Sequence, residues 1–349
     1  MKKLLVIIAL FTLAQQVIYS QQKDFQPKPS DKPSKGQLEQ IKRKYGMFIH
    51  FGINTFHDEE WTDGSKPSES YNPKIIDADQ WVLTAKNAGM KYVILVCKHH
   101  DGFCLWNSKY TTYDVASSPN KTNVVEIVAK ACKKYKIGLG LYYSLWDRKE
   151  NPNVGDVKQD KAYNKYMIKQ LDELLDIAGK YGKVVEFWFD GSWMKPNNRW
   201  PVQDIYNTIK EKQPLCQIGI NWSIGLPGNP DKQGLQPQNQ KEGYPIRFFP
   251  TDFRLGDPCL PGNTDPKIFS HNGKNYYMPW ESTVCLSSKW FYHTQDTIYK
   301  SIRELVDLYK RATAQDNILI INCPPNRKGS MRNKDAALLI ELRKKLNLK

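Results

Sequence analysis

Side chains able to do nucleophilic or acid–base chemistry stand at the ends of short apolar runs. Asp190 closes the run Val184–Asp190, and histidines end two earlier runs, His50 alone and His99-His100 as a pair. An aspartate in such a place can attack an electrophilic carbon, and a neutral histidine can both donate and accept hydrogen bonds. The same aspartate could equally cap a following helix, so its position alone leaves its role open.

The segments beyond these runs add carboxylates, aromatic rings and other polar side chains. They supply Glu60, Trp61, Asp101, Trp106, Tyr142, Tyr143, Asn221, Trp222, Asp252, Arg254, Asp257 and Glu281. Aromatic faces combined with His and Asn suit a sugar, because a pyranose has apolar C–H faces and a belt of hydroxyls. Two carboxylates on opposite sides of an anomeric carbon could then hydrolyse a glycosidic bond.

The paired histidines also allow a metal-dependent hydrolase built on His50, His99 and His100. Adjacent residues at a strand end point in different directions, however, so both rarely bind one ion. The chain has no HxH or HExxH spacing. We therefore expect no metal ion and no other cofactor.

The positioning elements read as an alternation of strands and amphipathic helices. The strand candidates are 46–51, 92–98, 137–144, 184–190, 217–222, 247–253, 283–287 and 318–322. The helix candidates are 78–90, 123–135, 160–181, 202–212, 297–314 and 335–346. Such a pattern predicts parallel strands joined by right-handed crossovers, and eight units make a (β/α)8 barrel whose working residues lie at the carboxyl ends of the strands. An open doubly wound sheet is the alternative, but no Gly-rich phosphate loop follows the first strand. The blurred region Gly225–Pro279 predicts an irregular barrel with a large insertion.

The N-terminus has the layout of a secretory signal peptide. A basic start at Met1–Lys3 precedes the apolar stretch Leu4–Leu13, and small or polar residues lead to a plausible cleavage point after Ser20. A membrane span needs about 20 apolar residues, roughly twice this stretch. We expect residues 1–20 to be removed, 21–35 to form a flexible leader and 36–349 to form a single catalytic domain, in a periplasmic or secreted protein.

The charge and the cysteines limit the partners. The formal net charge of +15 comes from lysines and arginines scattered along the chain. We expect these charges to form a solvated basic surface. Such a surface is compatible with an anionic glycan, for example a sulfated one. The sequence shows no basic–aromatic module of the kind that binds nucleic acids. The seven cysteines form no CxxC pair, which argues against a disulfide framework or a zinc site. The sequence predicts no membrane span and does not reveal the oligomeric state.

Several of these segments together resemble the α-L-fucosidase family, glycoside hydrolase family 29. They are Lys44–Gly52, Glu60-Trp61, Lys98–Phe103, Gly140–Ser144, Phe187–Gly191 and Asn317–Gly329. The resemblance extends from about Tyr45 to Leu346, and the KHHDGF segment is its most specific part. It implies an irregular barrel that removes terminal α-L-fucose from a fucosylated glycan with retention of configuration.

The resemblance also assigns roles to residues. Asp190 matches the family's nucleophile, whereas His50, His99 and His100 match residues that bind fucose hydroxyls. The resemblance places Glu60, Trp61 and Tyr143 in the same pocket. Trp106 and Arg254, which follow two of the predicted strands, are further candidates for substrate binding.

The acid/base is where this chain departs from the family. Asp252–Asp257 resembles a stretch that in some relatives ends in the catalytic Glu, but here it ends in Asp257. Glu281 resembles a second family segment, in which Thr283 replaces a Cys. Glu242 is a third, weaker candidate. Glu281 is preferred narrowly to Asp257, because a Glu side chain reaches further towards the separation of about 5–5.5 Å that retention requires. These departures keep open the alternative of a fucose-binding protein with little or no turnover.

Overall fold

The computed structural model describes residues 24–151, 153–195, 200–256 and 265–348. The expected signal peptide and Asp257 lie outside these residues.

Eight parallel strands form the centre of the molecule. In spatial order they are β11 (Glu281–Cys285), β12 (Ile318–Asn322), β1 (Tyr45–Ile49), β2 (Tyr92–Lys98), β3 (Gly138–Ser144), β4 (Val184–Asp190), β5 (Gln217–Ile220) and β8 (Phe253–Arg254). A parallel bridge between Arg254 and Trp280 joins the end of this order to the residue before β11, which nearly closes the ring. The predicted (β/α)8 barrel is confirmed.

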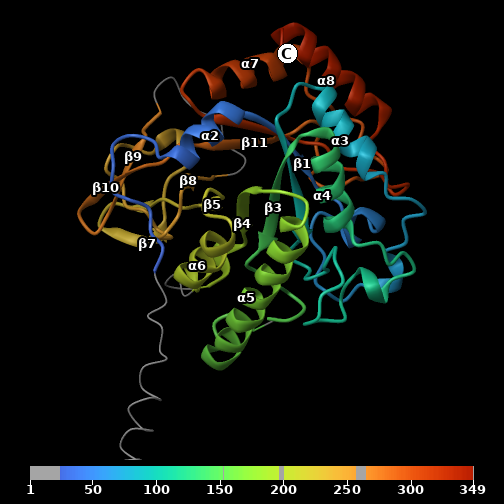
Figure 1. Cartoon of the computed structure of the whole chain (residues 1–349), viewed down its shortest axis with the longest axis horizontal. Coiled ribbons are helices and arrows are strands. Elements are labelled where there is room, and N and C mark those ends of the chain that lie inside the picture. Colours follow the sequence, from blue (N-terminus) through green and yellow to red (C-terminus); the bar gives the residue numbers. More distant parts are fainter. Residues whose placement is uncertain (1–23, 152, 196–199, 257–264, 349) are drawn as a thin grey trace, which may run out of the picture.

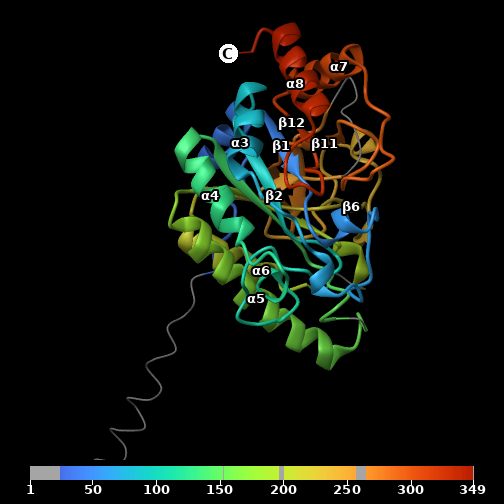
Figure 2. The same ribbon diagram turned by 90° about the vertical axis from the view of Figure 1, so that its right-hand side faces the viewer.

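Helices surround this barrel (Figures 1 and 2). They are α2 (Lys35–Arg43), α3 (Ala78–Asn87), α4 (Val124–Tyr135), α5 (Val157–Gly179), α6 (Val202–Lys212), α7 (Ile302–Thr313) and α8 (Asn333–Leu346). Two crossovers carry hairpins instead. β6 (Gly225–Leu226) pairs with β7 (Asn229–Gln233) between β5 and β8, and β9 (Ile268–His271) pairs with β10 (Lys274–Tyr277) between β8 and β11. These hairpins form the predicted insertion.

The sixth barrel strand is much shorter than expected. The sequence predicts a strand over 247–253, but β8 covers only Phe253–Arg254. Pro250 has no backbone N–H to donate, so pairing in a central strand begins only after it.

Side-chain alternation along the strands separates two apolar layers. One lies inside the barrel and includes Phe48, Val96, Tyr142 and Trp188; the other packs between strands and helices and includes Tyr143. Because successive side chains point to opposite faces, Asp190 follows Trp188 on the inner side.

An irregularity in β2 reverses this alternation before the histidines. The register with β3 shifts between Val96 and Lys98. Lys98 therefore joins the outer layer, where its ammonium lies 4.3 Å from the ring centroid of Tyr143. A bulge of this kind redirects a side chain close to a site.

Residues 24–34 lie against the barrel, although the sequence predicts a flexible leader there. The Phe25 N–H donates to Asn207 Oδ1, and Ser30 bridges Tyr276 of β10. Ser34 and Gln37 then form a capping box that begins α2.

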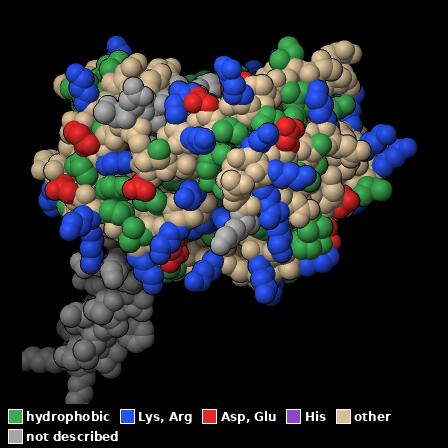
Figure 3. All heavy atoms as spheres, turned by 90° about the horizontal axis from the view of Figure 1, so that it is seen from above, with side chains coloured by type: hydrophobic (Ala, Val, Ile, Leu, Met, Phe, Trp, Pro, Cys, Tyr) green, Lys and Arg blue, Asp and Glu red, His purple; other side chains and the backbone are tan. Residues whose placement is uncertain are grey.

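The chain carries a formal net charge of +15. Lys and Arg side chains are spread over the face seen in Figure 3. Within the described part of the chain, no helix is long and apolar enough to cross a bilayer.

Candidate active site

A cavity of about 380 Å³ opens at the carboxyl ends of the barrel strands. Its lining combines histidines, aromatic rings, two amides and one carboxylate. These are Phe48, His50, Trp61, His99, His100, Tyr142, Trp188, Asp190, Trp193, Asn221, Trp222, Gln233 and Trp290. Asp190 is thus the only carboxylate among the described residues that line it.

Asp190 is held by hydrogen bonds to both carboxylate oxygens. Tyr142 Oη donates to Oδ2 over 2.9 Å, and Asn221 Nδ2 donates to Oδ1 over 3.0 Å. These donors come from the neighbouring strand β3 and from the residue after β5. They orient the carboxylate and stabilise its charge.

A glycine after Asp190 lets the loops on either side meet. Gly191 has φ 72°, and a Cβ there would lie 2.6 Å from Trp146 Cβ. Any larger residue would push Trp146 away and shift the end of β4, which explains the Asp-Gly pair at this strand end.

His50 and His100 each have one ring nitrogen bound to a neighbouring side chain. His50 Nδ1 lies 2.7 Å from Asn322 Oδ1, and His100 Nδ1 lies 2.6 Å from Ser144 Oγ. His100 Nε2 is 3.6 Å from Asp190 Oδ2. Burial lowers the pKa of His50 to about 3; burial also lowers that of His100, to about 4, although Asp190 opposes this shift. Both rings are neutral at physiological pH.

His99 lies between these two rings. Its ring is parallel to that of Tyr142 at 5.7 Å, and its Nδ1 is buried without a hydrogen-bond partner, 3.9 Å from Asp101 Oδ2. Burial lowers the pKa of His99, and so do the two neighbouring histidines. The three predicted histidines therefore meet in one cavity, as the sequence indicates.

The lowered pKa values predict that these histidines do not titrate near neutrality. In the folded protein, the imidazole C–H resonances of His50 and His100 should keep constant shifts between pH 5.5 and 8. The unfolded chain, measured in urea, should show ordinary titration near about 6.5. A folded-state midpoint near 6 for either ring, measured by NMR, would contradict their neutral assignment.

Tryptophans form the rim of the cavity. Trp61 is 51% exposed, lies edge-on to His100 at 5.2 Å, and is nearly parallel to Trp193 at 6.5 Å. Trp290 lies 5.1 Å from His50 on the other side. Such faces suit the apolar side of a sugar.

Glu60 lies beside this rim. Its Oε2 accepts from the Trp290 N–H over 3.0 Å, and its Oε1 is 2.9 Å from His293 Nε2. Burial raises the pKa of Glu60, although the Trp290 N–H and His293 oppose the shift. Glu60 is thus a partly buried carboxyl adjacent to the cavity.

Three residues predicted to bind substrate do not reach the cavity. Trp106 is buried and donates from Nε1 to Glu173 on α5. Tyr143 points to the helix side, where its Oη donates to Gln170, because alternation places Tyr142 inside instead. Arg254 is fully buried in an ion pair with Asp265. None of these three side chains lines the cavity.

The preferred acid/base, Glu281, lies at the wrong end of the barrel. It is the first residue of β11 and pairs with Ile318, the first residue of β12, whereas Asp190 is the last residue of β4. Glu281 Oε2 accepts from Tyr92 Oη over 2.8 Å, at the start of β2. Burial, reinforced by the nearby Glu186 carboxylate, raises the pKa of Glu281. Glu281 therefore cannot face Asp190 across a sugar.

This position predicts a stability effect instead of a catalytic one. Burial raises the pKa of Glu186 as well, so the folded protein holds protons that the unfolded chain releases above pH 4.5. The stabilisation is therefore complete below that value and is lost as pH rises. Between pH 5 and 8 the free energy of unfolding, measured by urea denaturation, should fall less in Glu281→Gln than in wild type. The variant should keep kcat within about threefold of wild type, because it leaves Asp190 unchanged. A loss of kcat beyond a hundredfold in a folded variant would return Glu281 to the catalytic site.

Several lining residues were not predicted to contact substrate. Two of them follow from the strand register: Tyr142 and Trp188 point to the same face of the sheet as Asp190, because each lies an even number of residues from the Ser144–Asp190 pair. Gln233 ends β7 of the first hairpin, and Trp193 and Trp290 lie in connections between barrel strands; no pattern in the sequence indicates these three residues.

Similarity to known proteins extends over most of the chain. The family model described as Alpha-L-fucosidase matches residues 65–348. The chain belongs to the α-L-fucosidase family. Alpha-L-fucosidase 1 of Arabidopsis thaliana is 34% identical over 319 residues, covering 88% of this chain and 59% of the relative. Human plasma alpha-L-fucosidase is 27% identical, covering 82% of this chain and 62% of the relative. The chain thus spans about three fifths of the length of these curated relatives.

Solved structures in the family share the barrel. A family 29 fucosidase of Ruminococcus gnavus, solved in complex with fucose, superposes with a TM-score of 0.71 at 25% identity, covering 93% of this chain and 70% of that one. Alpha-L-fucosidase isoenzyme 1 of Paenibacillus thiaminolyticus gives 0.72 at 25% identity, covering 89% and 76%.

Proposed function

We propose that this fucosidase-family chain is an exo-acting α-L-fucosidase that hydrolyses terminal α-L-fucose by double displacement with retention. One observation carries the proposal: Asp190 is oriented by two hydrogen bonds in a cavity lined by neutral histidines and tryptophans. In the first step an Asp190 oxygen attacks the anomeric carbon while a carboxylic acid protonates the leaving oxygen. In the second step water, deprotonated by that group, hydrolyses the fucosyl ester.

The lining fits a small deoxy sugar. A neutral imidazole can donate a hydrogen bond to one hydroxyl and accept one from another. Because the ring carries no charge, it does not hold water more strongly than it holds a sugar hydroxyl. The aromatic walls can cover the C–H face and the methyl group at C5. A cavity of about 380 Å³ has room for one monosaccharide, which agrees with removal of a terminal residue.

The proposal is tested by the configuration of the first product. The purified protein should hydrolyse 4-nitrophenyl α-L-fucoside, and ¹H NMR should show α-L-fucose before the β anomer appears by mutarotation. The β anomer appearing first would refute retention. Fucose binding by calorimetry, with no hydrolysis of aryl or natural fucosides, would favour the alternative of a binding protein.

For the acid/base we propose Asp257, with Glu60 as the competing carboxyl. Asp257 follows β8 by three residues in the sequence, and Glu60 has the raised pKa that a proton donor needs. Removing the proton donor should slow a fucoside with a poor leaving group far more than an activated aryl fucoside. Comparing both substrates in Asp257→Asn and Glu60→Gln assigns the role to the variant with the larger difference.

We also propose that the protein is exported. Cleavage after Ser20 should give a mature chain beginning at Gln21, which N-terminal sequencing of the protein recovered outside the cytoplasm can check. An uncleaved chain in the cytoplasm would contradict this.

A further inference from the structure

The hydroxyl of Ser144 lies between His100 and a backbone carbonyl. Ser144 is the last residue of β3, and its Oγ lies 2.6 Å from His100 Nδ1 and 2.5 Å from the carbonyl oxygen of Trp146. Ser144 is fully buried and His100 nearly so. Water therefore cannot easily replace either partner.

These contacts determine which atoms carry hydrogen. A carbonyl oxygen only accepts, so the single hydroxyl hydrogen of Ser144 is donated to Trp146. Ser144 Oγ can then only accept from His100, whose Nδ1 must be protonated. The ring is neutral, so its one hydrogen is on Nδ1 and its Nε2 has a free lone pair.

The free lone pair lies on the side of the nucleophile. His100 Nε2 is 3.6 Å from Asp190 Oδ2, which is longer than a hydrogen bond. If Nε2 carried the hydrogen, a small ring movement would let it donate to Asp190 and weaken the attacking carboxylate. We propose that Ser144 is a positioning residue that fixes the tautomer of His100, so that Nε2 accepts from a substrate hydroxyl and donates nothing to Asp190.

His50 has the same arrangement with a different partner. Asn322 Nδ2 donates to the Trp290 carbonyl over 2.8 Å, so its Oδ1 faces His50 and accepts from Nδ1. Two separate side chains thus leave two imidazoles with Nε2 as an acceptor. A cavity with two such acceptors selects a ligand that presents hydroxyl hydrogens.

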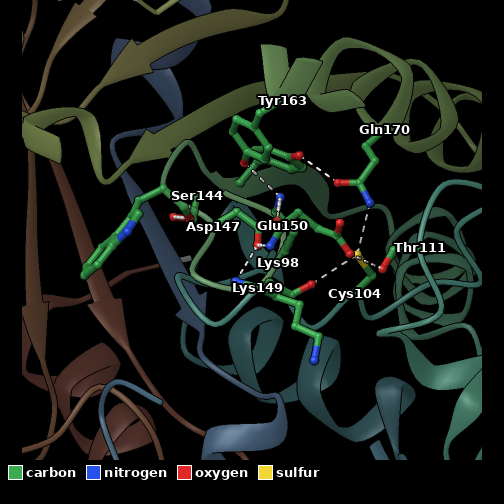
Figure 4. A network of polar contacts seen from close by, with 12 residues as sticks. Lys98, Cys104, Thr111, Ser144, Asp147, Lys149, Glu150, Tyr163 and Gln170 are labelled. Atoms are coloured by element: carbon green, nitrogen blue, oxygen red, sulfur yellow. Dashed lines mark hydrogen bonds and ion pairs between the residues drawn. The ribbon is translucent and has the colours of Figure 1, made fainter. Parts of the chain in front are cut away.

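A buried ion pair holds the loop that carries the Trp146 carbonyl (Figure 4). Asp147 accepts from Lys98 Nζ over 2.6 Å and from the backbone N–H groups of Lys149 and Glu150. The Arg148 N–H donates to the His100 carbonyl over 2.8 Å, which ties this loop to the histidine segment. The carbonyl that orients Ser144 is therefore itself fixed.

Nitrogen NMR of ¹⁵N-histidine-labelled protein tests the proposal directly. At pH 7, His100, assigned by loss of its signals in His100→Gln, should show a protonated Nδ1 and an unprotonated Nε2. A protonated Nε2 in wild type would overturn the proposal. This readout is independent of the proposed function, so a protein without fucosidase activity could still confirm or refute the tautomer.

Ser144→Ala tests the consequence for catalysis, and this part rests on the proposed function. Without its acceptor, His100 should place its hydrogen on Nε2, and kcat for an aryl fucoside should fall about 10- to 100-fold, with a smaller change in KM. Ser118→Ala is the matched control, because that buried serine also donates to a carbonyl, of Val115, but lies outside the cavity. If His100 stays protonated on Nδ1 in Ser144→Ala, or if kcat is unchanged, the proposed role of Ser144 is overturned. If the variant does not fold, the tautomer of His100 in the wild-type protein remains the test.

Discussion

Replacing Asp190 with alanine should lower kcat for an aryl α-L-fucoside by about 10⁴-fold or more, comparable to the loss of a nucleophile in other covalent enzymes. Asp190 is the only carboxylate among the described residues that line the cavity, so no neighbour there can take over the attack. Fucose affinity should change much less, because the histidines and tryptophans remain. Steady-state kinetics and fucose titration by calorimetry measure the two effects separately.

Azide distinguishes a missing nucleophile from a damaged fold. The alanine leaves room for a small anion beside Tyr142 and Asn221, so azide should restore turnover and give β-L-fucosyl azide, the inverted product. Asp204→Ala, on the exposed side of α6, is the control and should keep wild-type activity without azide. A Asp190→Ala variant that retains a tenth of wild-type activity would exclude this residue as the nucleophile.

The parts of the site that could be predicted are those that depend on strand periodicity and strand ends. Asp190, His50 and the His99-His100 pair end apolar strands, and a parallel barrel brings all such ends to one face. The same rule argues against Glu281, since that residue begins its strand instead of ending it. The greater reach of a Glu side chain, which favours Glu281 in the sequence, cannot span the length of a barrel strand.

What could not be predicted depends on local irregularities and on loops. The bulge after Val96 turns Lys98 outward, which two-residue periodicity alone does not anticipate. Trp193, Gln233 and Trp290 reach the cavity from connections whose course is set by tertiary packing. The choice of Tyr142 over Tyr143, in contrast, follows from parity with Asp190 once β3 and β4 are placed in register.

Lys98→Met should destabilise the protein by about 3–5 kcal/mol, because it leaves a buried carboxylate without its partner. Lys98 Nζ and Asp147 Oδ2 are 2.6 Å apart, and both side chains are fully buried. Burial alone lowers the pKa of Lys98, but Asp147 and Tyr143 outweigh it, so the net shift is upward and the lysine stays charged. Urea denaturation at pH 7 measures the loss. Activity should fall too, since the same pair holds the loop that orients Ser144 and His100.

A second ion pair of the same length shows why burial decides the size of this effect. Lys134 Nζ and Asp79 Oδ2 are also 2.6 Å apart, but their side chains are 59% and 47% exposed. Lys134→Met should therefore cost less than about 1 kcal/mol, because water solvates the charge that remains. Lys98→Met combined with Asp147→Asn removes both charges, and it should cost clearly less than the sum of the single changes. Equal losses at the two pairs, or strict additivity in the double variant, would show that Lys98 acts through packing and not through its charge.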